Sequence, residues 1–319
     1  MMRPRSYSGQ AMSGPADTQV MPMGEEAIAE AARLILSGEP VAVPTETVYG
    51  LAADATNPQA VARIYAAKGR PAFNPLIVHV PDLRGAEQIG RFNDRARELA
   101  LRHWPGPLTL VVPLRADSGV ASIVTAGLPT IAVRVPAHPV MQALLKACGK
   151  PLAAPSANAS GLISPTRASH VLASLGGRIP LVIDGGATQR GIESTIIAAT
   201  DGTLRLLRRG PIEVAASEER KPTAVEAPGQ LASHYAPRKP LRLDAVAAEA
   251  EEYFIGFGPI AGDVSLSESG DPVEAAARLF DLLHRADAAP QPRIAIAPVP
   301  GNGIAAAIRD RLKRAAAPR

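Results

Sequence analysis

The sequence predicts an α/β protein made of two domains of unequal size. The chain has 319 residues, which is long enough for two domains. Short apolar segments alternate with helical patterns along most of it, and a charged stretch rich in proline interrupts this alternation once. We therefore expect a disordered tail over 1–22, a first domain over 23–212, a linker over 213–240 and a small C-terminal α/β domain over 241–319.

The first domain is predicted to begin with a helix over 25–36, where apolar residues recur at helical spacing until Gly38. Asn57 and Pro58 supply a cap and a first-turn proline for a second helix that ends at Lys68. The same kinds of signal predict the other elements of this domain. They are helices over 93–103, 139–148 and after 166, and strands over 41–43, 76–80, 108–114, 130–135, 152–154, 181–184, 194–198 and 204–207.

The last two of these strands flank Asp201-Gly202, a pair typical of a type I′ hairpin turn. An antiparallel hairpin that follows alternating strands and helices favours a twisted, mixed sheet.

Beyond the linker, the pattern predicts helices near 245–252, 272–284 and 304–315 and strands over 253–257 and 294–299. This order indicates a parallel sheet. Two fragments, Gly256-Phe257-Gly258 and Gly301-Asn302-Gly303, resemble the start of a dinucleotide-binding loop. Neither completes that motif, so we interpret both as tight turns.

Composition excludes several classes of protein. The net charge of +4 suits contact with phosphates but does not by itself indicate nucleic-acid binding. A single cysteine, Cys148, excludes a disulfide framework and a multi-cysteine metal site, and the six histidines show no paired metal spacing. The first twenty residues lack the apolar core of a signal peptide, and no apolar run reaches the roughly 18 residues of a membrane helix. We expect a soluble, cytoplasmic protein without a protein-held metal.

The segment from Lys68 to Leu76 is the most informative part of the chain. Pro71 and Pro75 prevent it from continuing a helix or a strand, so it forms a stiff turn. Lys68, Arg70 and Asn74 are then held together at an element end, which suits an anionic ligand. In the alternative interpretation, Lys68 only interacts with the dipole of its helix and Arg70 is solvated.

Other small polar and cationic residues fall near the ends of predicted strands, the usual ligand-binding edge of an open α/β sheet. Each of them also has an ordinary structural explanation, such as turn chemistry or a polar sheet face. Together they predict a pocket for a polyanion and a small polar molecule. These residues are Thr45, Glu46, Thr47, His79, Thr130, Arg134, Ser156, Asn158, Ser164, Ser194 and Arg208.

Seven segments of the chain resemble the YrdC-like family, in the order expected of that family. They are PTETVYGLAADA, KGRPAFNPLIVHV, HWPGPLTLVV, TIAVRVP, APSANASGLISPT, GIESTII and LRRGPI. The later HYAP segment and the terminal domain resemble the long, two-domain form of the family, the threonylcarbamoyl-AMP synthases. The resemblance implies a twisted, mixed-sheet YrdC-like catalytic domain followed by a small Rossmann-like domain.

The resemblance also implies a reaction. L-threonine, bicarbonate and ATP would combine into L-threonylcarbamoyladenylate with release of pyrophosphate, the first step of N6-threonylcarbamoyladenosine formation at position 37 of tRNAs that read ANN codons. Mg²⁺ would be carried by the ATP phosphates. The protein would make at most transient contact with tRNA and with the threonylcarbamoyl-transfer machinery, and none with membranes or DNA. Catalysis of this kind depends mainly on positioning and charge stabilisation.

Site residues follow from the motifs in the same way. Lys68 and Arg70 would be catalytic, and the HYAP segment would close over the nucleotide as part of a mobile linker. The threonine subsite would comprise Thr47, His79, Arg134, Ala154 and Ser194, with Arg134 binding the carboxylate. ATP would be held by Lys68, Arg70, Asn74, Thr130, Ser156, Asn158, Ser164, Arg208 and His234.

Two alternatives remain at this stage. One is a YrdC-like domain that serves another carbamoyl transfer, as in hydrogenase maturation, although no acylphosphatase or zinc-finger region is present. The other is a non-catalytic RNA-binding module, which a mildly basic groove would suit.

Overall fold

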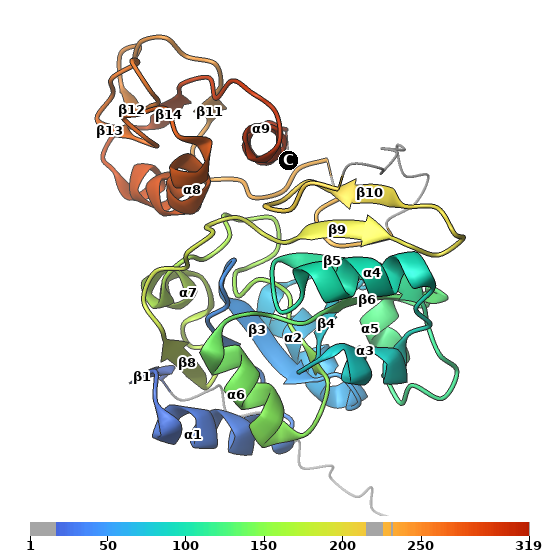
Figure 1. The fold of residues 1–319 in the computed structure, drawn as a ribbon. Helices are drawn as coiled ribbons and strands as arrows, with labels where there is room; N and C mark the ends of the chain where they lie inside the picture. Colours follow the sequence, from blue (N-terminus) through green and yellow to red (C-terminus); the bar gives the residue numbers. More distant parts are fainter. Residues whose placement is uncertain (1–16, 215–225, 231, 319) are drawn as a thin grey trace, which may run out of the picture.

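A computed structural model describes residues 17–214, 226–230 and 232–318. It contains a first domain built on one large sheet and a small domain that sits above it at one end (Figure 1). The strands of the first domain are β1 (Gln19–Pro22), β2 (Val41–Val43), β3 (Gly50–Asp54), β4 (Ile77–His79), β5 (Leu108–Pro113), β6 (Thr130–Arg134), β7 (Leu152–Ala153), β8 (Leu181–Asp184), β9 (Thr195–Ala198) and β10 (Arg205–Arg208).

The large sheet has ten strands in the order β1-β8-β2-β3-β7-β4-β6-β5-β9-β10. The sheet contains both parallel pairs, such as β4 with β6, and antiparallel pairs, such as β5 with β6, so the predicted mixed sheet is confirmed. The register pairs Ile77 with Ala132 and His79 with Arg134. Alternate residues of a strand share a face, so these four side chains point to the same side of the sheet.

Helices cover one face of this sheet and half of the other. In one core cluster, apolar residues of the helix over 58–68 and of neighbouring helices pack against Val78, Leu110 and Val133 of the sheet. On the opposite face, another cluster packs two helices over the half formed by β2, β3, β7 and β8. The helices of the domain are α1 (Glu25–Leu36), α2 (Pro58–Lys68), α3 (Leu83–Ile89), α4 (Asp94–His103), α5 (Ser122–Thr125), α6 (Pro139–Cys148) and α7 (Ala168–Leu175), and α1 and α6 form that second layer.

The other half of that face, over β4, β6, β5 and β9, carries a separate small apolar cluster. Ile77, Ala132 and Ile196 belong to it, and Ala227 of the predicted linker packs on them. The uncovered half of the sheet is therefore roofed by chain from outside the domain, which leaves a cleft between the sheet and this roof.

The small domain carries a four-stranded sheet in the order β11-β14-β12-β13, and every pair in it is parallel, as predicted. Its apolar core is centred on Ile255, Leu279, Phe280 and Ile308. Its elements are β11 (Leu241–Arg242), β12 (Glu252–Gly256), β13 (Val264–Ser265), β14 (Arg293–Ile296), α8 (Pro272–Ala288) and α9 (Ile304–Ala315).

The structure of α2 confirms the helix-end residues that the sequence predicted. The Asn57 side chain accepts hydrogen bonds from the backbone N–H groups of Gln59 and Ala60, and Pro58 occupies the first turn. Gly69 ends the helix in the left-handed conformation, with φ of 59°. This end fixes the place of Lys68, the last residue of the helix.

Three expectations about the first domain were wrong. Residues 19–22, assigned to the disordered tail, form β1, which pairs in parallel with β8; residues 1–16 lie outside the described part. It is an edge strand with mostly exposed side chains, so it carries no apolar pattern. The strand β3 was missed because its alanine-rich sequence is buried on both faces and does not alternate. The short helices α3 and α5 were missed as well.

The hairpin signal at Asp201-Gly202 was also wrong in detail. β9 and β10 do pair in antiparallel fashion, but residues 199–204 separate them, so the loop is longer than a type I′ turn. The Asp201 carboxylate instead accepts hydrogen bonds from the backbone N–H and the hydroxyl of Thr203, which stabilises a local turn.

In the small domain, the helix predicted near 245–252 is absent from the described chain. This segment is irregular, with positive φ at Asp244 and Glu251, and Glu252 already begins β12. The Glu252 carboxylate accepts hydrogen bonds from Arg242 and from the Glu249 backbone N–H. The bond from Arg242 of β11 and the local bond from Glu249 together override the helix propensity of the Ala- and Glu-rich sequence.

The predicted linker is only partly described, because residues 215–225 and 231 fall outside. Several of its described residues are buried, among them Ala227, Tyr235 and Ala236, whereas Ala232, Arg238 and Pro240 are exposed. Among the described residues, no helix is both long and apolar enough to cross a membrane.

Candidate functional site

The candidate site is a small cavity in the cleft over β4, β6 and β9, roofed by Pro228, Gly229, His234 and Tyr235. Its enclosed volume is ≈ 50 Å³, far below the roughly 300–1,000 Å³ of a typical ligand pocket. The described roof therefore fills most of the cleft.

The five residues predicted for threonine binding all line this one cavity. They come from different parts of the first domain: the loop after β2, the ends of β4 and β6, the end of β7 and the start of β9. The β4–β6 register places His79 beside Arg134 on the cavity face. The residues are Thr47, His79, Arg134, Ala154 and Ser194.

Arg134 is held by three groups of the protein. Its guanidinium donates to Glu46 Oε1 at 2.5 Å, to Thr47 Oγ1 at 3.0 Å and to the Gly106 carbonyl at 3.2 Å. Burial pushes the pKa of Glu46 upward, but its attraction and hydrogen bond to Arg134 outweigh this, so the net shift is downward. Two of the five N–H groups of Arg134 remain for a ligand.

His79 is uncharged in this site. Burial and then the positive charge of Arg134 lower its pKa to about 3. Its Nδ1 atom is buried and has no hydrogen-bond partner among the described residues. A neutral imidazole offers one donor and one acceptor, so His79 suits a polar uncharged group of a ligand.

Arg208 and Ser194 form a second buried unit on the neighbouring hairpin. Arg208 donates from Nε to the Ser194 carbonyl and from Nη2 to Ser194 Oγ, both at 3.0 Å. The Ser194 hydroxyl also shares a hydrogen bond of 2.7 Å with Thr109 Oγ1. Burial lowers the pKa of Arg208. This guanidinium and Arg134 approach the cavity from different strands.

Arg70 lines the same cavity and is only 9% exposed, so the alternative that it is solvated is wrong. Its guanidinium donates to the carbonyls of Asn74 and Pro75 at 3.1 and 2.8 Å. The two carbonyls belong to the proline-stiffened turn, so the turn fixes the direction of the cation. Burial lowers the pKa of Arg70 to about 10.

Lys68 lies behind Arg70 and binds the 156–158 loop. Its Nζ donates to the carbonyls of Ser156 and Asn158, both at 2.5 Å. Burial, and then repulsion by Arg70, lowers the pKa of Lys68 well below its usual value. Because the Lys68 ammonium binds this loop, the alternative in which Lys68 only interacts with the dipole of its helix is insufficient.

The predicted ATP residues separate into two groups. Arg70, Ser156, Arg208 and His234 line the cavity, whereas Lys68, Asn74, Thr130, Asn158 and Ser164 do not. Lys68 and Asn74 belong to the same turn as Arg70. Thr130 is half-buried at the start of β6, and Ser164 donates its hydroxyl to Glu193 Oε1 at 2.5 Å.

Several buried polar atoms of these residues lack a partner in the described chain. Both side-chain atoms of Asn74, Oδ1 of Asn158, Nδ1 of His234 and the Tyr235 hydroxyl are in this position, as is Nδ1 of His79. A buried polar atom without a partner costs about 1–3 kcal/mol. His79, His234 and Tyr235 line the cavity, so a polar ligand bound there could supply partners for these three side chains.

The roof is fitted closely to the site. A Cβ at Gly229 would lie 2.6 Å from the Tyr235 hydroxyl and 3.0 Å from Arg208 Cδ, and its φ of +88° also favours glycine. His234 and Tyr235, from the HYAP segment, both line the cavity. The sequence indicated the HYAP segment but not the hydrogen bond by which Arg208 Nη1 donates to the Pro228 carbonyl of the roof, at 3.4 Å.

Sequence reasoning missed the role of Glu193. It lines the cavity, is 6% exposed, and binds Ser164 and Arg311. The position of Glu193 directly before Ser194 could have indicated a site residue. Its pairing with Arg311 could not be predicted, because the two residues are 118 positions apart in the sequence.

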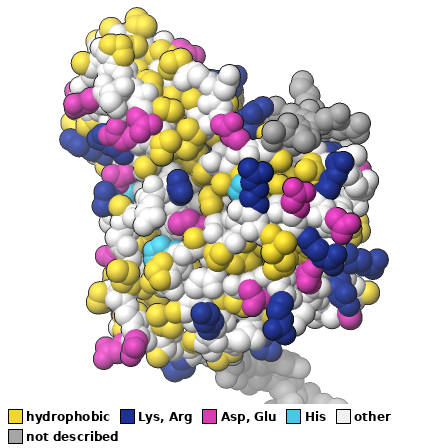
Figure 2. All heavy atoms as spheres, in the orientation of Figure 1, with side chains coloured by type: hydrophobic (Ala, Val, Ile, Leu, Met, Phe, Trp, Pro, Cys, Tyr) yellow, Lys and Arg dark blue, Asp and Glu magenta, His cyan; other side chains and the backbone are white. Residues whose placement is uncertain are grey.

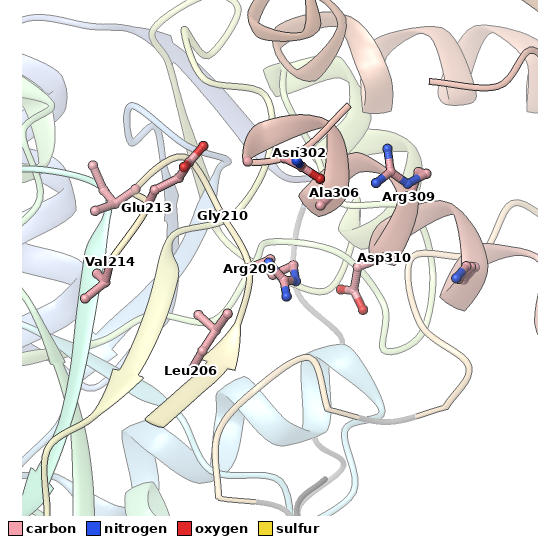
Figure 3. A pocket seen from close by; sticks show the side chains of 12 residues that line it. Leu206, Arg209, Gly210, Glu213, Val214, Asn302, Ala306, Arg309 and Asp310 are labelled. Atoms are coloured by element: carbon pink, nitrogen blue, oxygen red, sulfur yellow. The ribbon is translucent and has the colours of Figure 1, made fainter. Parts of the chain in front are cut away.

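Two wider hollows contain none of the predicted site residues. One, of ≈ 610 Å³, lies between β10 and α9, where Arg209 and Asp310 face the same gap (Figure 3). The other, of ≈ 780 Å³, is lined by residues of α3 and α6. On the face seen in Figure 2, basic and acidic side chains are interspersed over both domains, so the cations of the candidate site are distinguished by burial. Among the described residues, no group of three or more His, Cys, Asp or Glu could hold a metal.

Comparison with known proteins agrees with this geometry. The Sua5/YciO/YrdC family model, described as "Telomere recombination", matches residues 33–210. A second model, "Threonylcarbamoyl-AMP synthase, C-terminal domain", matches residues 188–317. The threonylcarbamoyl-AMP synthase of Bacillus subtilis is 40% identical over 335 aligned positions, which cover 94% of this chain and 95% of the relative. That of Pyrococcus abyssi is 40% identical and covers 89% and 92%.

Solved structures give the same result. The crystal structure of Pyrococcus abyssi Sua5 complexed with L-threonine superposes with a TM-score of 0.85 at 35% identity, over 93% of this chain and 96% of that one. Escherichia coli YciO superposes with a TM-score of 0.56 at 22% identity, over 63% and 100%. The second likeness supports only the fold of the first domain.

Proposed function

The chain belongs to the Sua5/YrdC family of threonylcarbamoyl-AMP synthases, and we propose from this premise how its own residues carry out the reaction. The reaction joins L-threonine, bicarbonate and ATP into L-threonylcarbamoyladenylate and releases pyrophosphate. One observation supports the assignment of the site above all: the five residues expected to bind threonine share a single buried cavity with Arg70 and Arg208.

L-Threonine occupies the part of the cleft beside Arg134. Its carboxylate accepts hydrogen bonds from the two remaining N–H groups of that guanidinium, which Glu46 and Thr47 hold in place. Neutral His79 and the Ser194 hydroxyl bind the polar groups of the amino acid. Serine lacks only the methyl group, so we expect discrimination between the two of about 10–200-fold.

ATP places its phosphates toward Arg70, with Lys68 and Asn74 behind it on the same turn. An anion beside Lys68 favours its charged form, because an opposite charge raises the pKa of an ammonium group. Asn158, Ser156, Thr130, Ser164, Arg208 and His234 complete the proposed nucleotide-binding set.

The chemistry needs no covalent protein nucleophile. The threonine amine and bicarbonate condense to a carbamate with loss of water. A carbamate oxygen attacks the α-phosphorus, the bond from that phosphorus to the β-phosphate bridging oxygen breaks, and pyrophosphate leaves. The buried cations stabilise the charge that develops on the phosphoryl oxygens.

Magnesium fits this site only when it enters bound to the nucleotide. Among the described residues, Glu193 lines the cavity and Glu46 binds Arg134, and each of these carboxylates is hydrogen-bonded to an arginine. We therefore propose that Mg²⁺ is bound by the triphosphate and water, where it supplies further charge neutralisation.

Nucleotide binding requires the roof to move, because ≈ 50 Å³ does not hold a nucleotide. We propose that the HYAP segment, His234–Pro237, withdraws as ATP enters and then closes over it. The product is then delivered, in the cytoplasm, to the machinery that modifies adenosine 37 of tRNAs reading ANN codons.

Pyrophosphate release tests the proposal. The purified chain is given ATP and Mg²⁺ with threonine and bicarbonate together, or with each omitted in turn. We expect release only when both are present, with threonylcarbamoyladenylate identified by mass spectrometry. Equal pyrophosphate release without either substrate would identify simple hydrolysis of ATP to AMP and pyrophosphate instead.

A further inference from the structure

Arg311 is a fully buried arginine of α9 that faces the first domain. Its side chain is 0% exposed, although arginine is almost never fully buried unless it is paired. Its Nε donates to Glu193 Oε2 at 2.8 Å, its Nη2 to the Arg209 carbonyl at 2.9 Å, and its Nη1 to Asp310 Oδ2 at 2.9 Å. Two of these three acceptors belong to the first domain.

The two acceptors in the first domain stand next to substrate-site residues. Glu193 directly precedes Ser194, and Arg209 directly follows Arg208. Ser194 and Arg208 bind each other through two hydrogen bonds and line the cavity. One guanidinium from the small domain therefore fixes the chain on both sides of this pair.

Glu193 is fully used as a structural acceptor. Its Oε1 accepts from the Ser164 hydroxyl and its Oε2 from Arg311. The carboxylate lines the cavity, but both oxygens bind the protein, so its position depends on Arg311.

The same arginine also contacts the roof of the site. Its guanidinium carbon lies 5.1 Å from the centre of the Tyr235 ring, within cation–π distance. Phe280 of α8 stacks on the same ring, with centroids 5.6 Å apart. The small domain thus contacts the Tyr235 ring through both Arg311 and Phe280, and the Tyr235 hydroxyl lies close to Gly229 and the cavity.

We propose that Arg311 is a positioning residue for the synthase reaction. It does not line the cavity; it acts by ordering Glu193, the Arg209 backbone and Tyr235, and through them Ser194 and Arg208. The small domain thereby completes the substrate site. This inference rests on the proposed function, since it concerns the affinity of that site for L-threonine and ATP.

The first test replaces Arg311 by lysine. Lysine keeps the charge and can reach Glu193, but a single ammonium cannot reproduce the guanidinium fork that also binds the Arg209 carbonyl. The matched control is Arg309→Lys on the same helix, because among the described residues Arg309 donates to the Val299 and Gly301 carbonyls of its own domain. We expect Arg311→Lys to raise the KM for threonine and for ATP at least about tenfold, with unchanged values for Arg309→Lys.

A second variant separates positioning from a role in stability alone. Glu193→Gln with Arg311→Met removes both buried charges, so neither is left unpaired. If Arg311 serves only stability, this double variant regains both the wild-type melting temperature and the wild-type KM. We expect the melting temperature to recover while the KM for both substrates stays raised.

Calorimetry measures the Kd for L-threonine directly, so this test does not depend on turnover. A weaker Kd in Arg311→Lys and in the double variant, at normal melting temperature, supports the inference. Wild-type Kd and KM in both variants would overturn it. Failure of the proposed function looks different, because the unmodified chain itself would then neither bind threonine nor release pyrophosphate in a threonine-dependent way.

Discussion

The two domains use buried charge in opposite ways. In the first domain, Arg70, Arg134 and Arg208 converge on one cavity beside polar atoms that lack partners in the described chain. In the small domain, the core is apolar, and its buried charged side chains, among the described residues, are Glu252 and Arg311. Glu252 pairs with Arg242 within the domain, whereas Arg311 extends to the other domain.

This difference indicates a division of labour. Buried charges cost free energy unless they are paired, so a cluster of cations is retained where an anionic ligand provides the pairing. The small domain carries no such cluster in its described part. It contacts residues of the site through Arg311, which binds Glu193 and lies against the Tyr235 ring. Its core nevertheless continues into the first domain at Val48, Ile163 and Ile192.

The largest effect should follow from removing a cation of the first domain. Arg70→Ala deletes a buried guanidinium proposed to face the phosphates, so we expect pyrophosphate release to fall by about 10³-fold. Arg102→Ala, at the exposed end of α4, is the control and should retain full activity. Circular dichroism should show that both variants remain folded; normal turnover by a folded Arg70→Ala variant would contradict its role.

The next effect concerns the core of the small domain. Leu279 is completely buried in it, so Leu279→Ala should lower the free energy of unfolding by about 3 kcal/mol. At 25 °C the folded fraction keeps Arg311 in place, and the KM for threonine should stay normal. Urea unfolding followed by kinetics on the same sample checks both; a raised KM would show that the core, and not Arg311 alone, shapes the site.

Sequence patterns predicted much of the fold where the signals are local. Asn57, Pro58 and Gly69 mark both ends of α2, and the bounds of α9 agree with the prediction. The predictions for β1 and for residues 245–252 were wrong. Pairing with β8 decides the conformation of β1, and the Arg242–Glu252 bond decides that of residues 245–252.

The same reasoning applies to the site. Cations and hydroxyls near strand ends, together with the family motifs, indicated the five threonine-binding residues and four of the nucleotide-binding residues that the fold brings into one cavity, whereas Lys68, Asn74, Thr130, Asn158 and Ser164 lie outside its lining. Local patterns cannot show that Glu193 pairs with Arg311 or that Glu46 holds Arg134, because these partners meet only through tertiary structure.

A smaller effect concerns pH. His79 has a pKa of about 3 in the folded protein and about 6.5 when unfolded, so the unfolded chain binds a proton that the folded chain does not. Its contribution to stability is complete above pH 6.5 and is lost by up to about 1.4 kcal/mol for each pH unit as pH falls toward 3. His79→Gln should therefore lose less stability between pH 6.5 and 5 than the unmodified chain. Identical slopes in urea unfolding would show that His79 is protonated in the fold.

The smallest effect should come from a helix cap remote from both the cavity and the domain interface. Asn57→Ala removes the acceptor for two backbone N–H groups, so unfolding should become easier by about 1 kcal/mol. Asn57→Asp keeps the acceptor and should restore stability. Pyrophosphate release should be unchanged in both variants, and a large loss of activity would mean that the start of α2 controls the position of Lys68.

The central claim is that one cavity in the first domain seats both substrates. A crystal structure of the full chain with L-threonine and a non-hydrolysable ATP analogue tests it most directly. We expect the threonine carboxylate within hydrogen-bond distance of Arg134, and the α-phosphate between the amino acid and Arg70. Threonine or nucleotide bound instead in the ≈ 610 Å³ hollow between β10 and α9, with the cleft still closed, would contradict the account.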